Sequence, residues 1–171
     1  MIQPEKIIIA DDHPLFRQAL LATLKLKLTQ TQWLEAQTIA ELEQQLSENN
    51  DSDLVLLDLH IPGAHGFNTL IHVRNHFPQI PVVIVSAHED HEIIHKAMGY
   101  GASGFIPKST PVEDIYNANF QANEYKARLD SGNTDYSVSL LKKKGNKPVS
   151  FFLDTSYTIG EIIDAEYSVQ E

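Results

Sequence analysis

The sequence contains no cysteine and no long apolar run. The lack of cysteine excludes disulfide bonds, thiolate nucleophiles and cysteine-ligated zinc within this sequence. No apolar stretch approaches the roughly 18 residues of a membrane-spanning helix, so we expect a cytoplasmic protein with no membrane segment. Basic residues are also few, because 13 Lys and Arg stand against 23 Asp and Glu. The resulting formal charge of -10 argues against a general nucleic-acid-binding surface.

What the sequence does have is a fivefold alternation of strand-like and helix-like segments. Short runs rich in Ile, Val and Leu predict five strands, at residues 6–10, 33–36, 54–59, 82–86 and 104–107. Apolar residues at helical spacing predict five helices, at residues 13–28, 39–49, 67–77, 90–98 and 111 to about 129. Thr38 with Glu41, and Thr110 with Glu113, have the spacing of capping boxes at two of the helix starts.

This alternation predicts a parallel sheet with helices on both faces. We expect a flavodoxin-like (βα)5 doubly wound α/β fold with strand order 2-1-3-4-5, in a domain that spans residues 1–129. Residues 130–171 follow another pattern, with alternating apolar residues at 136–141 and 149–153 around a turn-like segment at 144–147. We expect a small, β-rich C-terminal extension there, which packs on the first domain or on a second copy.

Three carboxylates stand at the ends of two expected strands. Asp11 and Asp12 follow the apolar run 7–10, and Asp58 follows the run 54–57. In the strand order above, these two strand ends are neighbours, so the three acids share one crevice. Clustered carboxylates repel one another unless a cation is present, and oxygen ligands suit Mg²⁺, which commonly sits beside a phosphoryl group. The alternative is that Asp11 or Asp12 caps the next helix and Asp58 only ends a strand.

Ser86, Phe105 and Lys108 lie near the ends of the fourth and fifth expected strands. In this topology those ends flank the same crevice, where a hydroxyl and an ammonium group can each bond to a phosphoryl oxygen. Taken singly, Ser86 is better explained as a helix cap and Lys108 as a solvated surface lysine. Their joint spacing with the three acids favours a phosphorylation site.

At this point the chain resembles the receiver domain of bacterial two-component response regulators, in the subfamily fused to LuxR-type helix-turn-helix domains. The resemblance covers about residues 5–120 and rests on the segments ADDHPLFR at 10–17, LDLHIPG at 57–63, SAH at 86–88 and GASGFIPKS at 101–109. It implies that Asp58 is the phosphoacceptor and that Lys108 contacts the phosphate. It also implies a Mg²⁺ site formed by Asp11, Asp12, Asp58 and the main-chain carbonyl of His60.

The resemblance further implies a mechanism. The Asp58 carboxylate attacks a phosphohistidine of a sensor histidine kinase or phosphotransfer protein, or a small acyl phosphate. Ser86 is then drawn toward the phosphoryl group, and Phe105 turns inward into the vacated volume. The chain is expected to catalyse its own phosphotransfer and dephosphorylation without turning over an external substrate, so we do not expect a conventional enzyme.

The sequence departs from the family pattern in three respects, one of which is that Ser109 follows Lys108 where many receivers have proline. His60 and His88 lie two residues beyond Asp58 and Ser86, at positions that in this family flank the path of the hydrolytic water. The C-terminal extension has no recognisable helix-turn-helix, so DNA binding by this chain is not expected. We expect protein contact instead, including self-association through the extension and the apolar residues of the last helix, Ile115, Phe120, Tyr125 and Leu129.

Two other functions remain as alternatives. A Mg²⁺-dependent phosphatase of the haloacid dehalogenase type also uses an aspartyl nucleophile, but it needs a second carboxylate two residues on, where this chain has His60. A receiver-like scaffold that binds partners without phosphate is disfavoured by the intact set of acids. His72 with His76, and His91 with His95, have metal-ligand spacing, but polar helix faces explain them better.

Overall fold

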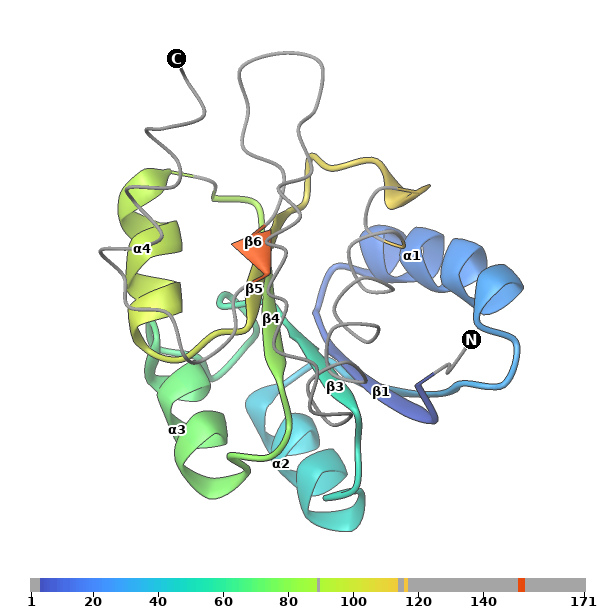
Figure 1. The fold of residues 1–171 in the computed structure, drawn as a ribbon, viewed down its shortest axis with the longest axis horizontal. Coiled ribbons are helices and arrows are strands. Elements are labelled where there is room, and N and C mark those ends of the chain that lie inside the picture. Colours follow the sequence, from blue (N-terminus) through green and yellow to red (C-terminus); the bar gives the residue numbers. More distant parts are fainter. Residues whose placement is uncertain (1–3, 89, 114–115, 117–150, 153–171) are drawn as a thin grey trace, which may run out of the picture.

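The computed structural model describes residues 4–88, 90–113, 116 and 151–152. In this part of the chain, helices cover both faces of a central sheet (Figure 1). Val112, Glu113 and Tyr116 are helical, as expected for the start of the fifth predicted helix. The rest of that helix lies outside the described residues, together with the predicted strand at 136–141 and the proposed self-association residues.

Five parallel strands form the sheet, and their order confirms the flavodoxin-like prediction 2-1-3-4-5. They are β1 (Lys6–Ala10), β2 (Gln32–Ala36), β3 (Leu54–Leu57), β4 (Val82–Ser86) and β5 (Gly104–Pro107). Strand β3 ends two residues earlier than predicted. The backbone N–H of Asp58 still donates to the carbonyl of Ala10 at 2.8 Å, so one ladder bond continues past the end of the strand.

A sixth strand, β6 (Phe151–Phe152), pairs antiparallel with β5. It lies within the strand predicted at 149–153. Phe151 stands opposite Phe105 in the register, and Phe152 stands opposite Gly104. Strand β6 therefore covers the outer edge of β5, one of the two edge strands of the five-stranded parallel sheet, and β2 is the other.

Four helices have complete bounds: α1 (Pro14–Lys27), α2 (Ile39–Glu48), α3 (Asn68–His76) and α4 (His91–Gly99). Helices α1, α2 and α3 are slightly shorter than predicted, because residues expected at their ends act as caps, whereas α4 has the predicted length and lies one residue later. At the start of α2, the Thr38 hydroxyl accepts a hydrogen bond from the N–H of Glu41 at 3.2 Å. The Glu41 carboxylate bonds back to the N–H of Gln37 instead of that of Thr38, so the predicted capping box is formed in a shifted version.

The core has two layers, one on each face of the sheet. Ile8 and Ala10 of β1 face α2, α3 and α4, whereas Ile7 and Ile9 face α1. This separation follows from the period of two along a strand. The four residues Ile7–Ala10 are almost completely buried, as are those of β3, which is expected for inner strands of a sheet covered on both faces.

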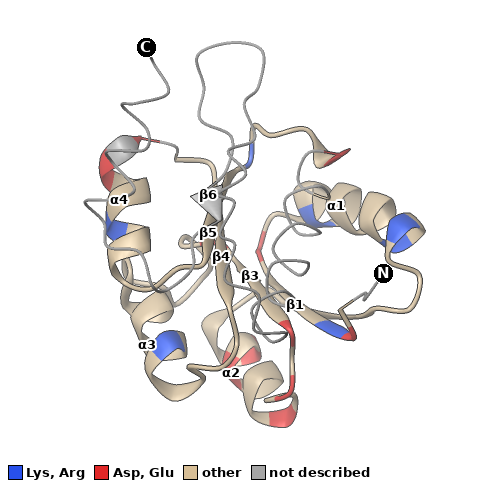
Figure 2. Ribbon diagram, in the orientation of Figure 1, with Lys and Arg blue, Asp and Glu red and all other residues tan. Residues whose placement is uncertain are grey.

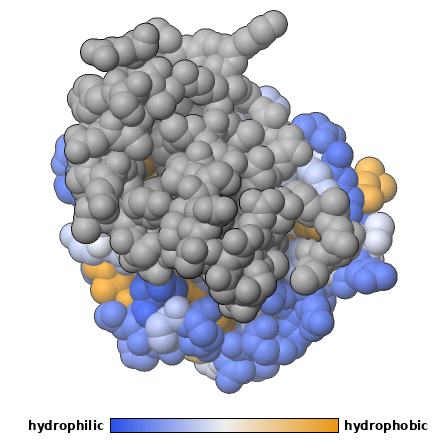
Figure 3. Space-filling view, in the orientation of Figure 1, coloured by the Kyte–Doolittle hydropathy of each residue, from blue (hydrophilic) through white to orange (hydrophobic). Residues whose placement is uncertain are grey.

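Figure 2 marks where Lys, Arg, Asp and Glu lie along the ribbon, and the visible surface outside the grey region is mostly hydrophilic (Figure 3). Lys25 and Lys27 lie in the last turn of α1, where a positive charge stabilises the helix dipole. Leu15 and Leu26 of the same helix are the most exposed large apolar residues among those described. Within the described residues, none of the helices has the length and apolarity to cross a membrane.

Candidate functional site

The register of the sheet places the acids side by side at the carboxyl ends of the strands. Ala10 of β1 stands opposite Leu57 of β3, so Asp11 and Asp58 are the next residues of two neighbouring strands. Asp11 extends the other side of β1 in the same way, because its N–H donates to the carbonyl of Ala36 at 2.9 Å. These backbone bonds fix the positions from which the two carboxylates project.

Asp58 and Asp11 are the two most buried of the three acids, because each residue is only 2% exposed. One Asp58 oxygen, Oδ1, accepts a hydrogen bond from the N–H of His60 at 3.0 Å. The other, Oδ2, accepts one from Lys108 Nζ at 2.8 Å. Asp12 is partly exposed, yet its Oδ1 atom is buried and accepts no hydrogen bond within the described part of the chain.

Lys108 supplies the positive charge that the sequence places here. Its Nζ lies 2.6 Å from Asp11 Oδ2 and 2.8 Å from Asp58 Oδ2, so one ammonium group bridges the carboxylates of β1 and β3. Its backbone N–H donates to the carbonyl of Ser86 at 2.8 Å, which ties the residue after β5 to the end of β4. Phe16 of α1 lies beneath the ammonium, with its ring centroid 4.9 Å away.

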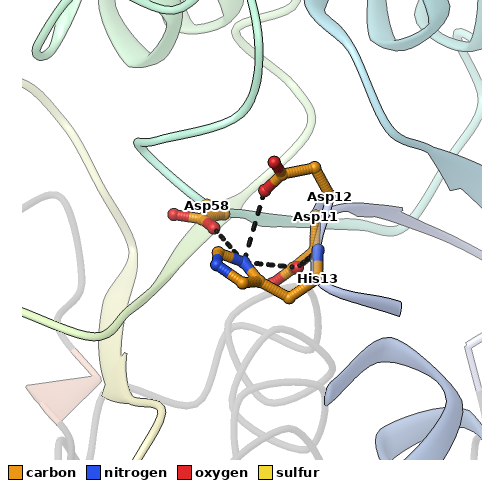
Figure 4. A group of neighbouring side chains, drawn as sticks. All are labelled: Asp11, Asp12, His13 and Asp58. Carbon is orange, nitrogen blue, oxygen red and sulfur yellow. Dashed lines mark hydrogen bonds and ion pairs between the residues drawn. The ribbon is translucent and has the colours of Figure 1, made fainter. Parts of the chain in front are cut away.

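His13 completes the group of side chains at the acids, and the sequence gave it no separate role. Its Nδ1 atom lies 3.3 Å from both Asp11 Oδ1 and Asp12 Oδ1, and 3.4 Å from Asp58 Oδ2 (Figure 4). Lys108 Nζ lies 2.9 Å from the same nitrogen. The imidazole therefore points into the acidic site, although more than half of its surface is exposed to solvent.

Ser86 and Phe105 are both buried. The Ser86 hydroxyl accepts a hydrogen bond from the N–H of His88 at 3.1 Å. Phe105 is 1% exposed and packs in the core layer that contains α2, α3 and α4. The expectation from the sequence was that Phe105 turns inward after phosphorylation, but in this structure the ring is already inside.

His60 and His88 stand at the rim of the site, where the sequence predicted two imidazoles beside the phosphorylation position. Their ring centroids lie 4.8 Å apart with the planes tilted by 46°. Both residues are exposed. His60 Nδ1 is also 3.7 Å from Asp58 Oδ1. The two imidazoles therefore pack against each other beside Asp58.

In the sequence, Arg17 stands out only as part of the segment at residues 10–17. In the structure, it supports the site through the backbone of Asp11. Its side chain is buried, and its Nη1 donates to the main-chain carbonyl of Asp11 at 2.6 Å. Its Nε donates to Glu35 Oε2 at 2.8 Å, which links α1 to β2. An arginine on an otherwise apolar helix face was the signal in the sequence that could have indicated this role.

The electrostatic balance of the site is negative. Three carboxylates face one ammonium group, and the buried Oδ1 atom of Asp12 has no hydrogen bond within the described residues. A divalent cation with oxygen ligands would neutralise this charge and occupy the free lone pairs. The donor set of Asp11, Asp12 and Asp58 thus fits the Mg²⁺ ion that the sequence predicted.

The family model and the known proteins that match this chain all indicate the same family. The family model of the response regulator receiver domain matches residues 7–119. The glycerol metabolism activator of Pseudomonas putida is 45% identical over 124 residues, which cover 67% of this chain and 55% of that protein. The probable transcriptional regulatory protein NarL of Mycobacterium tuberculosis is 34% identical over 119 residues, covering 68% and 54% respectively. The chain therefore spans about half the length of these curated relatives.

Solved structures resemble the fold over the same part of the chain. The signal receiver domain of the putative response regulator NarL from Mycobacterium tuberculosis has a TM-score of 0.63 and 27% identity. The match covers 72% of this chain and 98% of that one. A LuxR family DNA-binding response regulator from Silicibacter pomeroyi has a TM-score of 0.59 and 28% identity, with coverage of 68% and 88%.

Proposed function

The chain belongs to the response regulator receiver domain family of two-component signal transduction, and from that membership we propose that it accepts a phosphoryl group on Asp58. The observation that carries this assignment is the convergence of Asp11, Asp58 and Lys108 at the ends of β1, β3 and β5. A sensor histidine kinase or a phosphotransfer protein is the proposed donor.

The proposed reaction is an in-line displacement at phosphorus. An oxygen of the Asp58 carboxylate forms a bond to phosphorus while the bond from phosphorus to the donor's imidazole nitrogen breaks, and the imidazole leaves. Lys108 lies 2.8 Å from Asp58 Oδ2, which places its ammonium group to contact an oxygen of the incoming phosphoryl group. The buried surroundings of Asp58 strengthen this charge contact.

We assign Asp11, Asp12, Asp58 and the main-chain carbonyl of His60 as the residues that hold Mg²⁺. The bound ion supplies neutralisation of the charge on the phosphoryl oxygens. The unbonded Oδ1 atom of Asp12 supports this assignment, because a buried carboxylate oxygen without a donor is stabilised by a cation. Arg17 holds the Asp11 backbone in place through the carbonyl bond described above.

Ser86 and Phe105 form the proposed switch. An aspartyl phosphate offers acceptor oxygens to which the Ser86 hydroxyl donates, and this attraction draws the hydroxyl away from its present position, where it accepts from the His88 N–H. The rim histidines, His60 and His88, control access of water to the acyl phosphate, and so they act on the lifetime of the modification. Phe105 is already buried in this structure, so the proposed switch changes its surroundings through Ser86.

For the whole chain we propose a receiver domain at residues 1–129 and a C-terminal extension at 130–171 that contacts protein and not DNA. The pairing of β6 with β5 supports contact between the two. Self-association is the proposed output. Light scattering before and after phosphorylation measures it, and a chain that stays monomeric in both states contradicts it.

Since His60 stands where a second carboxylate is required, no observation favours the phosphatase alternative.

The central test is phosphorylation by a small acyl phosphate with Mg²⁺, measured by intact mass. We expect the parent to gain one phosphoryl mass and Asp58→Asn to gain none. Asp51→Asn is the matched control, because Asp51 is an exposed aspartate that pairs with Lys6 away from the site, and it should be labelled like the parent. Labelling of Asp58→Asn at the parent level contradicts the assignment of the phosphoacceptor.

A further inference from the structure

Two histidines lie one turn apart on the exposed side of α3. The imidazole rings of His72 and His76 are stacked, with their centroids 4.2 Å apart and their planes at 28°. The buried side of the same helix is formed by Thr69, Leu70 and Val73. Histidines at positions i and i+4 share one helix face, and helices bind zinc through pairs with this spacing. Both imidazoles are therefore within reach of one ion.

A hydrogen bond to the backbone selects the tautomer of His76. Its Nδ1 lies 2.9 Å from the main-chain carbonyl oxygen of His72. A carbonyl oxygen only accepts, so Nδ1 carries the proton and donates. In the neutral imidazole the lone pair is then on Nε2, where it is available to a metal ion. Histidines that bind metals in proteins usually donate to a carbonyl or a carboxylate through their second nitrogen in this way.

A carboxylate from the neighbouring helix adds a third ligand, which the sequence did not identify. Helices α2 and α3 pack on the same face of the sheet (Figure 1). Glu43 Oε1 of α2 lies 3.8 Å from His72 Nε2. This separation is too long for a hydrogen bond, but it is shorter than about 4.2 Å, which is twice a typical distance from zinc to nitrogen or oxygen. One ion can therefore bind both atoms.

The surroundings of Glu43 leave its carboxylate available to a cation. Among the described residues, His72 is the only basic side chain in ion-pair range of Glu43. The two side chains are 56% exposed for Glu43 and 44% exposed for His72, so water screens their attraction and an ion pair between them contributes little. Two imidazole nitrogens and one carboxylate oxygen also form a ligand set that binds zinc in metalloenzymes.

We propose that His72, His76 and Glu43 form a surface site for Zn²⁺, with water at the fourth position. Among the described residues, only the acidic site at the strand ends already holds its ligand atoms within 4.8 Å of one another. One of the three side chains on α2 and α3 therefore rotates when zinc binds. All three are exposed, and exposed side chains change rotamer rapidly. The zinc site shares no residue with the proposed phosphorylation site and does not depend on it.

The two helices hold the ligands on a rigid base. Leu42 and Leu46 of α2 and Leu70 and Val73 of α3 are buried in the same core layer, so the backbones that carry the ligands are fixed relative to each other. The unfolded chain does not hold Glu43 beside the histidines. Zinc therefore binds the folded chain more tightly, links α2 to α3 and raises the melting temperature.

The experiment titrates the full chain with Zn²⁺ by calorimetry in excess Mg²⁺, which occupies sites made of carboxylates alone. We expect one Zn²⁺ per chain and a higher melting temperature in its presence. His76→Ala should lower the affinity for Zn²⁺ at least about tenfold, because one of the three protein ligands is lost. Glu43→Gln should lower it at least about threefold, since a neutral amide is a weaker ligand than a carboxylate.

Two control variants separate this site from other candidates. His95→Ala removes an exposed histidine on α4, from the other pair with i and i+4 spacing in the sequence. Asp12→Ala removes a proposed ligand of the acidic site. Both variants should bind Zn²⁺ like the parent. Circular dichroism confirms the folding of each variant.

Four results overturn the proposal. The first is a parent chain that does not bind Zn²⁺. The second is parent affinity in a folded His76→Ala or in a folded Glu43→Gln. The third is loss of Zn²⁺ binding in His95→Ala or Asp12→Ala, which places the ion elsewhere. The fourth is half a Zn²⁺ per chain together with a mass that doubles in light scattering, which shows zinc bridging two copies.

Discussion

At the scale of single residues, Lys108 offsets part of the negative charge of the site. Its side chain is largely buried between Asp11 and Asp58, so its charge acts in a region where water screens it little. The ammonium group offsets the repulsion between two carboxylates that the sheet register forces together. The proposed contact with a phosphoryl oxygen and the stability of the fold therefore depend on the same ammonium group of Lys108.

We expect Lys108→Met to lower the free energy of unfolding at neutral pH by about 1–3 kcal/mol, because it leaves buried carboxylates without a partner. Added Mg²⁺ should then stabilise this variant more than it stabilises the parent, since the ion replaces the missing charge. Urea unfolding with and without Mg²⁺ measures both effects. Lys108→Met with parent stability in the absence of Mg²⁺ contradicts the expectation.

Lys96→Met is the control for the loss of a lysine. Lys96 pairs with Glu92 one turn away on α4, and the hydrogen bond to that carboxylate raises the pKa of the exposed lysine. Exposed pairs of this kind contribute little to stability, because water and salt screen them. We therefore expect Lys96→Met to unfold like the parent and to show no altered response to Mg²⁺.

At the scale of the element, the loop between β3 and α3 determines where Asp58 and His60 stand. The carbonyl of Pro62 accepts a hydrogen bond from the N–H of Ile39, which ties this loop to the start of α2. Gly63 follows with a φ of 91°, a conformation that side-chain-bearing residues rarely adopt. A Cβ at this position would lie 3.3 Å from the Ile39 side chain, so both the backbone and the packing favour glycine.

We expect Gly63→Ala to destabilise the fold by about 1–3 kcal/mol through this backbone conformation. Gly66→Ala in the same loop is the comparison, because Gly66 has a φ of 55° and its Cβ would meet no atom within 4 Å. Its cost should be smaller, at about 1 kcal/mol. Thermal unfolding of the two variants tests the order. Equal destabilisation would contradict the expectation that the φ of Gly63 and its approach to Ile39 make this substitution the costlier of the two.

At the scale of the whole molecule, the core residues that the structure describes lie within the proposed receiver domain. Both core layers are built from residues between Ile7 and Tyr116. Of the extension, the structure describes the two-residue strand β6, which pairs with the outer edge of β5. A strand of this length contributes few backbone hydrogen bonds, each with a net stabilisation of about 1 kcal/mol.

A chain shortened to residues 1–129 should therefore fold cooperatively, with a melting temperature lowered by no more than about 8 °C. It should also accept phosphate on Asp58 as the full chain does. Calorimetry and intact mass measure the two properties on the same sample. The absence of a cooperative transition would contradict the proposed division at residue 129.

Much of the architecture followed from local patterns in the sequence. Apolar runs that end at Asp11 and Asp58 predicted the strands and placed the acids at their ends, because strands have a recognisable apolar pattern. The βα alternation predicted the strand order, because connection rules limit the possible topologies. Lys108 and Ser86 were found through their spacing from strand ends. The roles of these residues in phosphorylation remain predictions.

Tertiary structure alone decided where the side chains point. The position of His13 Nδ1 depends on the register between β1 and β3, segments that are more than forty residues apart in the chain. The bond from Arg17 to the Asp11 carbonyl depends on how α1 packs on the sheet. The buried position of Phe105 depends on the packing of helices on that face. Sequence periodicity specifies which face a residue occupies, whereas contacts between distant segments select the orientation of its side chain.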